Sequence, residues 1–215
     1  MRFLRKSLIA LGTFAAAGLP VALSALPPAS AWEIGPFIRG RDYSVGMPRI
    51  PVPGRSGGWY FDFPYPSAEA GHVHYLTYPS DPLANASRIV IRYRIDAPHG
   101  TRFVPQEQQD KPAMLSLFFQ QRGDTWSGRG RYNTYRWYSV AMAPVTPGEH
   151  SLTVRLDDPW TPVNGGTNSG APAGFAAAKA DTGRVGFVLG SAGLRGHGVF
   201  ATAPARFTLI AFDVE

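Results

Sequence analysis

The feature that most constrains this fold is the clear alternation of apolar and polar residues between Ser87 and Ile95. Ile89, Ile91, Tyr93 and Ile95 share one face, and Arg88, Arg92 and Arg94 lie on the other. Side chains of a β-strand point alternately to opposite faces, so this pattern indicates a strand with one buried face and one face in solvent. The chain must therefore build a sheet whose apolar face is covered by another layer.

Similar signals recur along the chain, separated by turns such as Pro147-Gly148 and Asn164-Gly165-Gly166. The other candidate strands are 59–63, 72–78, 101–104, 114–121, 132–140, 151–156, 184–189 and 206–214. Only one segment, 175–180, has helical character, and it is short. We therefore expect an all-β fold, a two-sheet jelly-roll β-sandwich of about nine strands with at most one short helix.

The ends of the predicted domain indicate how it closes. The first and last candidate strands, 59–63 and 206–214, are both strongly apolar, so neither suits an exposed edge. We expect these two strands to pair with each other. Residues 32–57 are rich in glycine and proline and show little periodicity, which predicts an extended N-terminal segment ahead of a sandwich domain at 58–215.

Residues 1–31 have the organisation of a secretory signal peptide. Basic residues stand at the start, and an apolar stretch then runs from Leu8 to about Leu26. Ala29-Ser30-Ala31 provides the small-residue pattern at which signal peptidase cuts. We expect cleavage after Ala31 and a secreted or periplasmic mature protein.

Charge and cysteine content exclude several classes of partner and site. The predicted signal holds three basic residues and no acidic one, so its removal lowers the formal net charge of +6 by three. The remaining charge does not indicate a nucleic-acid partner. The absence of cysteine excludes disulfides and thiolate metal sites. Beyond the predicted signal, no apolar stretch approaches the roughly 18 residues that a membrane span needs.

The segment 126–138 holds five aromatic residues and three arginines. Sugar rings stack on flat aromatic side chains, and arginine or asparagine binds hydroxyl and carboxylate groups. The candidate stacking residues are Trp126, Tyr135 and Trp137, and the candidate polar contacts are Arg129, Arg131 and Asn133. The alternative is that these rings fill the core of the sandwich.

Asp157 and Asp158 follow a predicted strand directly. Paired carboxylates in such a loop can hold a structural calcium ion, which prefers oxygen ligands. The alternative is ordinary turn chemistry ahead of Pro159. No other cofactor is expected, because the chain has no phosphate-binding loop, dinucleotide fingerprint or zinc-protease motif.

From about Trp59 to Val214, the chain resembles the secreted bacterial jelly-roll modules of the galactose-binding-like group, which include many carbohydrate-binding modules. The resemblance is carried by the strand order and by three stretches of sequence: Tyr135-Arg136-Trp137-Tyr138, Val185-Gly-Phe-Val-Leu-Gly, and Gly196-His-Gly-Val followed by Phe207-Thr-Leu-Ile-Ala-Phe-Asp-Val. It implies a non-catalytic module that binds glycans through an aromatic surface, often beside a structural calcium ion.

These observations favour a secreted, non-catalytic β-sandwich that recognises a polysaccharide through an aromatic and arginine-rich surface. Two alternatives remain open. One is a structural or assembly protein of the cell envelope with protein partners, and the other is a small polysaccharide lyase or hydrolase on the same scaffold.

Overall fold

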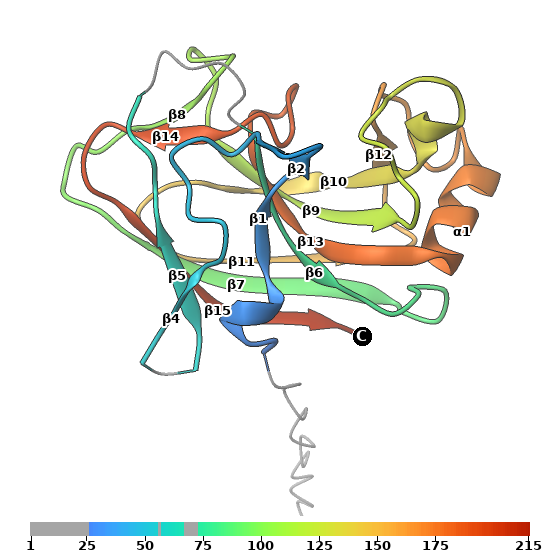
Figure 1. The fold of residues 1–215 in the computed structure, drawn as a ribbon, viewed down its shortest axis with the longest axis horizontal. Coiled ribbons are helices and arrows are strands. Elements are labelled where there is room, and N and C mark those ends of the chain that lie inside the picture. The colour runs from blue at the N-terminus through green and yellow to red at the C-terminus, as the bar shows by residue number, and fades with distance from the viewer. Residues whose placement is uncertain (1–25, 56, 67–72) are drawn as a thin grey trace, which may run out of the picture.

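A computed structural model describes residues 26–55, 57–66 and 73–215, and it shows two antiparallel sheets facing each other across one core (Figure 1). Most of the predicted signal peptide lies outside the described residues. None of the helices in the described part of the chain has the length and apolar character that crossing a membrane requires.

The six-stranded sheet runs, in spatial order, through β1 (Glu33–Gly35), β6 (His74–Pro79), β13 (Thr182–Gly190), β9 (Met114–Gln121), β10 (Arg136–Pro144) and β12 (Trp160–Pro162). The five-stranded sheet runs through β11 (Gly148–Arg155), β7 (Arg88–Asp96), β15 (Arg206–Val214), β5 (Trp59–Asp62) and β4 (Val52–Pro53). Two short pairs join β14 (Val199–Ala201) to β8 (Phe103–Pro105), and β2 (Phe37–Ile38) to β3 (Arg41–Asp42). The helical elements are α1 (Pro172–Ala180) and two 3-10 turns, η1 (Ala29–Ala31) and η2 (Gly130–Thr134).

The expected all-β sandwich is confirmed, but the expected number of about nine strands is wrong, because the described residues form fifteen. Seven of these strands have only two or three residues each, and all of them except β8 were missed: β1, β2, β3, β4, β8, β12 and β14. Alternation cannot be recognised over so few residues. The helix also begins earlier than the predicted 175–180, because Pro172 fits the first helical turn, where its missing N–H is not needed.

The pairing predicted between the first and last strand candidates is observed. β15 pairs antiparallel with β5, and Phe207 lies opposite Phe61. On its other side β15 pairs with β7. The most apolar end strand therefore occupies a protected central position in the five-stranded sheet.

Aromatic rings fill the space between the two sheets. The ring centroid of Phe187, in the six-stranded sheet, lies 5.2 Å from that of Phe207, in the five-stranded sheet, with 24° between the ring planes. Trp59 stacks on Phe187 at 6.2 Å, and Phe61 stacks on Phe207 at 5.0 Å. Since the chain has no cysteine, this packing rather than a disulfide holds the sheets together.

Trp32 ties the N-terminal segment into the same core. Its indole is 1% exposed, and its ring contacts those of Trp59, Tyr78 and Phe212 at centroid distances of 4.9, 4.7 and 5.3 Å. Within residues 32–57, β1 pairs at the edge of the six-stranded sheet and β4 at the edge of the five-stranded sheet. The segment therefore crosses from one sheet to the other.

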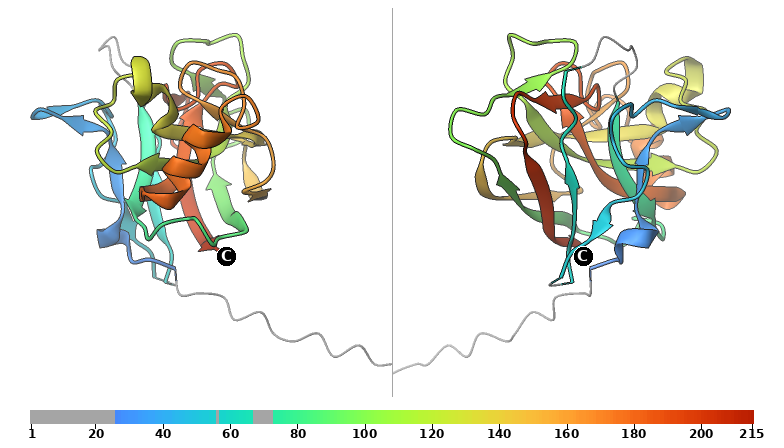
Figure 2. Two further views of the ribbon diagram at one scale, coloured as in Figure 1. Left: turned by 90° about the vertical axis from the view of Figure 1, so that its right-hand side faces the viewer. Right: turned by 60° about the vertical axis from the view of Figure 1, so that its left-hand side comes forward.

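Helix α1 covers one end of the sandwich, as the turned view in Figure 2 shows. Phe175 of α1 reaches into the core, where its ring lies 4.9 Å from Trp137, 5.6 Å from Phe119 and 6.4 Å from Trp160. The helix thus excludes water from the end of the core that lies near the loops after β9 and β12.

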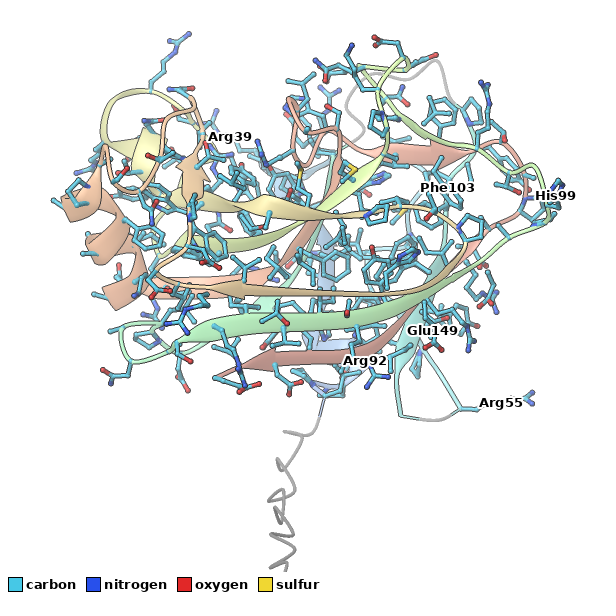
Figure 3. All side chains as sticks on the ribbon, turned by 180° about the vertical axis from the view of Figure 1, so that it is seen from behind. Arg39, Arg55, Arg92, His99, Phe103 and Glu149 are labelled. Atoms are coloured by element: carbon cyan, nitrogen blue, oxygen red, sulfur yellow. The ribbon has the colours of Figure 1, made fainter. Side chains whose placement is uncertain are left out.

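The outer faces of the two sheets differ. On β7 the predicted alternation is observed, with isoleucines buried and arginines exposed, and this solvent face carries Arg92 and Glu149 (Figure 3). On β9, six consecutive residues from Leu115 to Gln120 are buried. A strand buried on both faces needs cover on both sides. The six-stranded sheet must therefore be covered on its outer face as well.

We expect Gly186→Ala to destabilise the protein. Gly186 lies in the middle of β13, where an added Cβ would overlap the carbonyl oxygen of Leu76 and lie 2.8 Å from the Cα of Thr77. Backbone cannot yield cheaply, so overpacking should lower the free energy of unfolding by about 1–3 kcal/mol, measured by urea denaturation. Gly170→Ala is the control, because its Cβ would meet only Thr167 O at 3.4 Å. Equal stability of the two variants would contradict the close approach of β6 and β13.

Candidate functional site

A second apolar cluster covers the outer face of the six-stranded sheet. Its buried members come from four adjacent strands: Tyr75, Phe118, Tyr138 and Val188. Trp126 packs against this cluster from the loop after β9. The cluster is separate from the main core, so it supplies the cover that β9 and β13 need on this side.

Two tyrosines meet at the centre of this cluster. The hydroxyl groups of Tyr75 and Tyr138 lie 2.8 Å apart and share a hydrogen bond. Burial raises the pKa of both phenols above the ordinary value. Both side chains therefore stay protonated at neutral pH, and they act through hydrogen bonds rather than as charged groups.

A buried ion pair holds the loop that carries Trp126. Asp124 Oδ2 lies 3.0 Å from Arg136 Nε, and the side chains are only 1% and 7% exposed. Gln120 donates to the same carboxylate oxygen at 2.7 Å, and Arg136 also donates to Ser127 O at 2.8 Å. Burial raises the pKa of the Asp124 carboxyl, and the Arg136 guanidinium opposes that rise. Breaking such a pair leaves an uncompensated buried charge, so the loop is held firmly to β9 and β10.

Trp126 occupies an unusual backbone position. Its φ of 63° lies in the left-handed region, which costs a non-glycine residue about 1–3 kcal/mol. The half-buried ring meets Tyr75 edge to face at 5.0 Å, and the Arg136 guanidinium lies over it at 5.1 Å. These contacts hold the ring in place and offset the backbone cost. Strained positions of this kind concentrate at ligand-binding sites.

The first hollow is a cavity of about 380 Å³ beside Trp126. Gln120 lines it, and its amide orientation follows from the donation of Nε2 to Asp124. Gln120 Oε1 is buried and has no hydrogen-bond partner among the described residues. A buried acceptor without a partner is costly, so a ligand that displaced the lining side chains slightly would gain a hydrogen bond to this atom.

Charges around the first hollow are paired. Arg184 Nη2 lies 3.4 Å from Glu33 Oε2, and Arg184 also donates to Thr77 Oγ1 at 2.8 Å. On the rim, Arg122 Nη1 lies 3.2 Å from Asp181 Oδ1. This hollow therefore offers hydrogen-bonding groups, while its charges are already compensated.

The second hollow, of about 190 Å³, lies on the other side of Tyr75, which lines both. Its polar lining residues are Tyr75, Arg136, Tyr138, Thr161, Arg195 and His197. His197 comes from the loop before β14, and its Nδ1 lies 2.9 Å from Glu107 Oε1. The two hollows together form the candidate functional site.

Of the six residues that the sequence analysis assigned to ligand binding, the structure places only Trp126 at these hollows. Arg129 and Arg131 are exposed around η2, and Arg131 stacks on Tyr132 at 5.1 Å. Asn133 Oδ1 accepts a hydrogen bond from the backbone N–H of Asn164 at 2.8 Å. The half-buried Tyr135 is outside the lining described for either hollow.

The assignment of Trp137 to ligand stacking is wrong. Its side chain is fully buried, its ring packs on Phe175, and its indole N–H donates to Thr134 O at 2.8 Å. The predicted strand 132–140 also begins too early, because residues 130–134 form the turn η2 and β10 starts at Arg136. Tyr138, on the opposite face of the strand from Trp137, contributes to the site instead.

Asp157 and Asp158 both accept hydrogen bonds from Arg155, the last residue of β11. Asp157 accepts two hydrogen bonds from the Arg155 guanidinium, at 2.8 and 2.9 Å, and Asp158 Oδ2 accepts the Arg155 backbone N–H at 2.8 Å. This is the turn chemistry that the sequence left as an alternative to calcium. Within the described ranges, no group of three or more histidine, aspartate or glutamate side chains could hold a metal ion.

The sequence analysis missed most of the residues that line the site. The missed residues are Tyr75, Gln120, Asp124, Arg136, Tyr138, Arg184, Arg195 and His197. One signal was present in β9, where the polar Gln120 ends a run of apolar residues. Arg136 and Tyr138 lie within the segment 126–138, two apart on β10, but the remaining residues come from other strands and loops that local spacing does not connect.

Comparison with known proteins does not assign this arrangement to a family. No protein-family model matches the chain, and no curated protein matches it.

We expect Trp137→Ala to unfold the protein far more readily than Trp126→Ala. Removing the fully buried Trp137 ring should lower the free energy of unfolding by about 3–5 kcal/mol. The half-buried Trp126 should cost much less, because its ring removes less apolar surface from water than the fully buried ring of Trp137. Urea titrations followed by circular dichroism compare the two, and the opposite order would contradict the assignment of Trp137 to the core.

Proposed function

We propose that this protein is a non-catalytic carbohydrate-binding β-sandwich that recognises a polysaccharide at the two hollows on its six-stranded sheet. The observation that carries the proposal is the half-buried Trp126, held at the first hollow in a strained conformation beside an unsatisfied acceptor, Gln120 Oε1. The apolar face of a sugar ring packs on an indole, and its hydroxyl groups donate to such an acceptor.

Polar groups around both hollows also support a sugar ligand. Sugar hydroxyl groups need donors and acceptors at close range, and the hollows offer both, from Gln120, Thr161 and the paired phenols of Tyr75 and Tyr138. The resemblance to carbohydrate-binding modules points in the same direction. In this proposal, the aromatic surface centres on Trp126 and the second cluster rather than on residues 129–137.

One observation favours a second candidate, a polysaccharide lyase or hydrolase. Glu107 orients the His197 ring, which lines the second hollow with the protonated phenols of Tyr75 and Tyr138. A histidine held by a carboxylate can transfer protons. Release of reducing ends, or of an unsaturated product that absorbs in the ultraviolet, would establish this activity and replace the non-catalytic proposal.

We expect Trp126→Ala to abolish glycan binding while the protein stays folded. Affinity electrophoresis through gels that contain different soluble polysaccharides measures binding as retardation. Tyr132→Ala is the matched control, because it removes a half-buried ring of the same aromatic segment that is outside the described lining of both hollows. Retardation should survive in the Tyr132 variant and be lost in the Trp126 variant.

Three other outcomes of these gels are informative. Loss of binding in both variants would contradict the placement of the site at the first hollow. Migration unaffected by every polysaccharide, together with proteins that co-purify with the chain, would favour an envelope assembly role. Loss of retardation in EDTA would show that a metal is required and would return calcium at Asp157 and Asp158 to consideration.

We further propose that the protein is exported and cut after Ala31. A cut there would leave Trp32 as the first residue, so the ring that joins the N-terminal segment to the core would remain in the mature chain. We expect mass spectrometry of the protein recovered from the periplasm or the culture medium to give residues 32–215. A cell-associated product that retains residues 1–31 would contradict the proposal.

A further inference from the structure

The second hollow differs from the first in its net charge. Among the described residues that line it, Arg136, Arg195 and His197 are basic, and none is acidic. Asp124 compensates Arg136 from the loop behind it, and Glu107 contacts His197. Arg195 is the basic residue of this lining whose charge is not compensated.

Arg195 is half-buried and makes no ion pair within the described part of the chain. Its Nε is buried and has no hydrogen-bond partner there. Burial lowers the pKa of its guanidinium, which shows that the group is taken out of water without full compensation. Buried charges in proteins are normally paired, so an unpaired guanidinium in a hollow calls for an anionic partner.

The tyrosine pair adds a neutral donor to the same hollow. Both phenols are protonated, and the hydrogen bond between Tyr75 and Tyr138 uses only one of the two hydroxyl protons. The other proton is left to donate to a different acceptor. Thr161 lines the hollow from β12 as well, but its hydroxyl donates to Pro162 O at 3.3 Å and is left only as an acceptor. A forked guanidinium beside a hydroxyl donor matches the acceptor-only oxygens of a carboxylate or sulfate.

Size limits what can enter. At about 190 Å³ the hollow is smaller than the roughly 300–1,000 Å³ of pockets that enclose a whole small ligand. It is therefore suited to one substituent of a larger molecule. Since Tyr75 lines both hollows, a ligand that packs against Trp126 in the first hollow can place a neighbouring group in the second.

We infer that the second hollow binds an anionic substituent of the polysaccharide, a uronate carboxylate or a sulfate ester, through Arg195 and the Tyr75–Tyr138 pair. This inference rests on the proposed function and narrows its ligand to acidic polysaccharides. The anionic group binds to the guanidinium fork and to the free phenol proton. Trp126 contacts the sugar ring, and a neutral polysaccharide would make that same contact.

The test uses matched polymers in affinity electrophoresis of the mature protein. Polygalacturonate is paired with its methyl ester, which keeps the rings and linkages and removes the charge, and dextran sulfate is paired with dextran. Alginate and hyaluronate extend the range of uronates. We expect stronger retardation by the charged member of at least one pair or by one of the added uronate polymers, and the polymer that retards identifies carboxylate or sulfate as the recognised group.

Arg195→Gln should weaken binding to the acidic polymer about tenfold or more, because a hydrogen-bonded charge contact is lost. Arg195→Lys should retain part of the binding, since it keeps the charge but loses the fork. The control is Arg92→Gln, which removes one exposed positive charge from the opposite sheet (Figure 3). Thermal unfolding of each variant shows whether it is folded.

Equal losses in the Arg195 and Arg92 variants would overturn the inference, because non-specific charge attraction would then explain the binding. A second outcome would also overturn the inference: neutral polymers retard the protein at least as much as acidic ones do, and Arg195→Gln does not change that retardation. The proposed function would still stand. If no polymer of either kind retards the protein, both the proposed function and this inference fail.

Discussion

Aromatic packing between the two sheets is the interaction on which the rest of this structure depends. Phe187 and Phe207 stack across the interior, and Trp59 and Trp32 extend that stack toward the N-terminal segment. With no disulfide to limit the unfolded chain, the free energy that keeps the sheets together comes mainly from burying these rings.

The candidate site results from how the six-stranded sheet is covered. The five-stranded sheet leaves its outer face to solvent, with charged side chains along β7. The six-stranded sheet instead buries Tyr75, Phe118 and Tyr138 on its outer face, under a loop held by the Asp124–Arg136 pair. This cover is incomplete, and the two hollows lie on either side of Tyr75. Structural cover and candidate binding surface are thus formed by the same residues.

The two hollows differ in a way that bears on ligand choice. Around the first hollow, carboxylates and guanidinium groups neutralise one another, so hydrogen bonding and ring contact dominate. In the second, the charge of Arg195 is uncompensated. In the proposed function, a neutral sugar ring and an adjacent acidic group would therefore find different partners in the two hollows.

Much of the fold could be predicted from local pattern. The alternation at 87–95 predicted β7, and the apolar character of 59–63 and 206–214 predicted the β5–β15 pairing. Of the strands with two or three residues, only β8 was predicted, because so few residues do not define a period. The 3-10 turn at 130–134 was not predicted either, so the assumed start of β10 was too early. Trp137 was assigned to a ligand-binding surface, although it lies in the core.

The sequence by itself determined the class of fold and the strands that build its core, because period-two alternation is a local property that each strand carries in its own residues. Only the tertiary structure decided which aromatic residues face the core and which face the site. Trp137 and Tyr138 are neighbours of similar character, yet one packs on Phe175 and the other meets Tyr75. That choice depends on strand register and on partners far away in the chain, which no local spacing encodes.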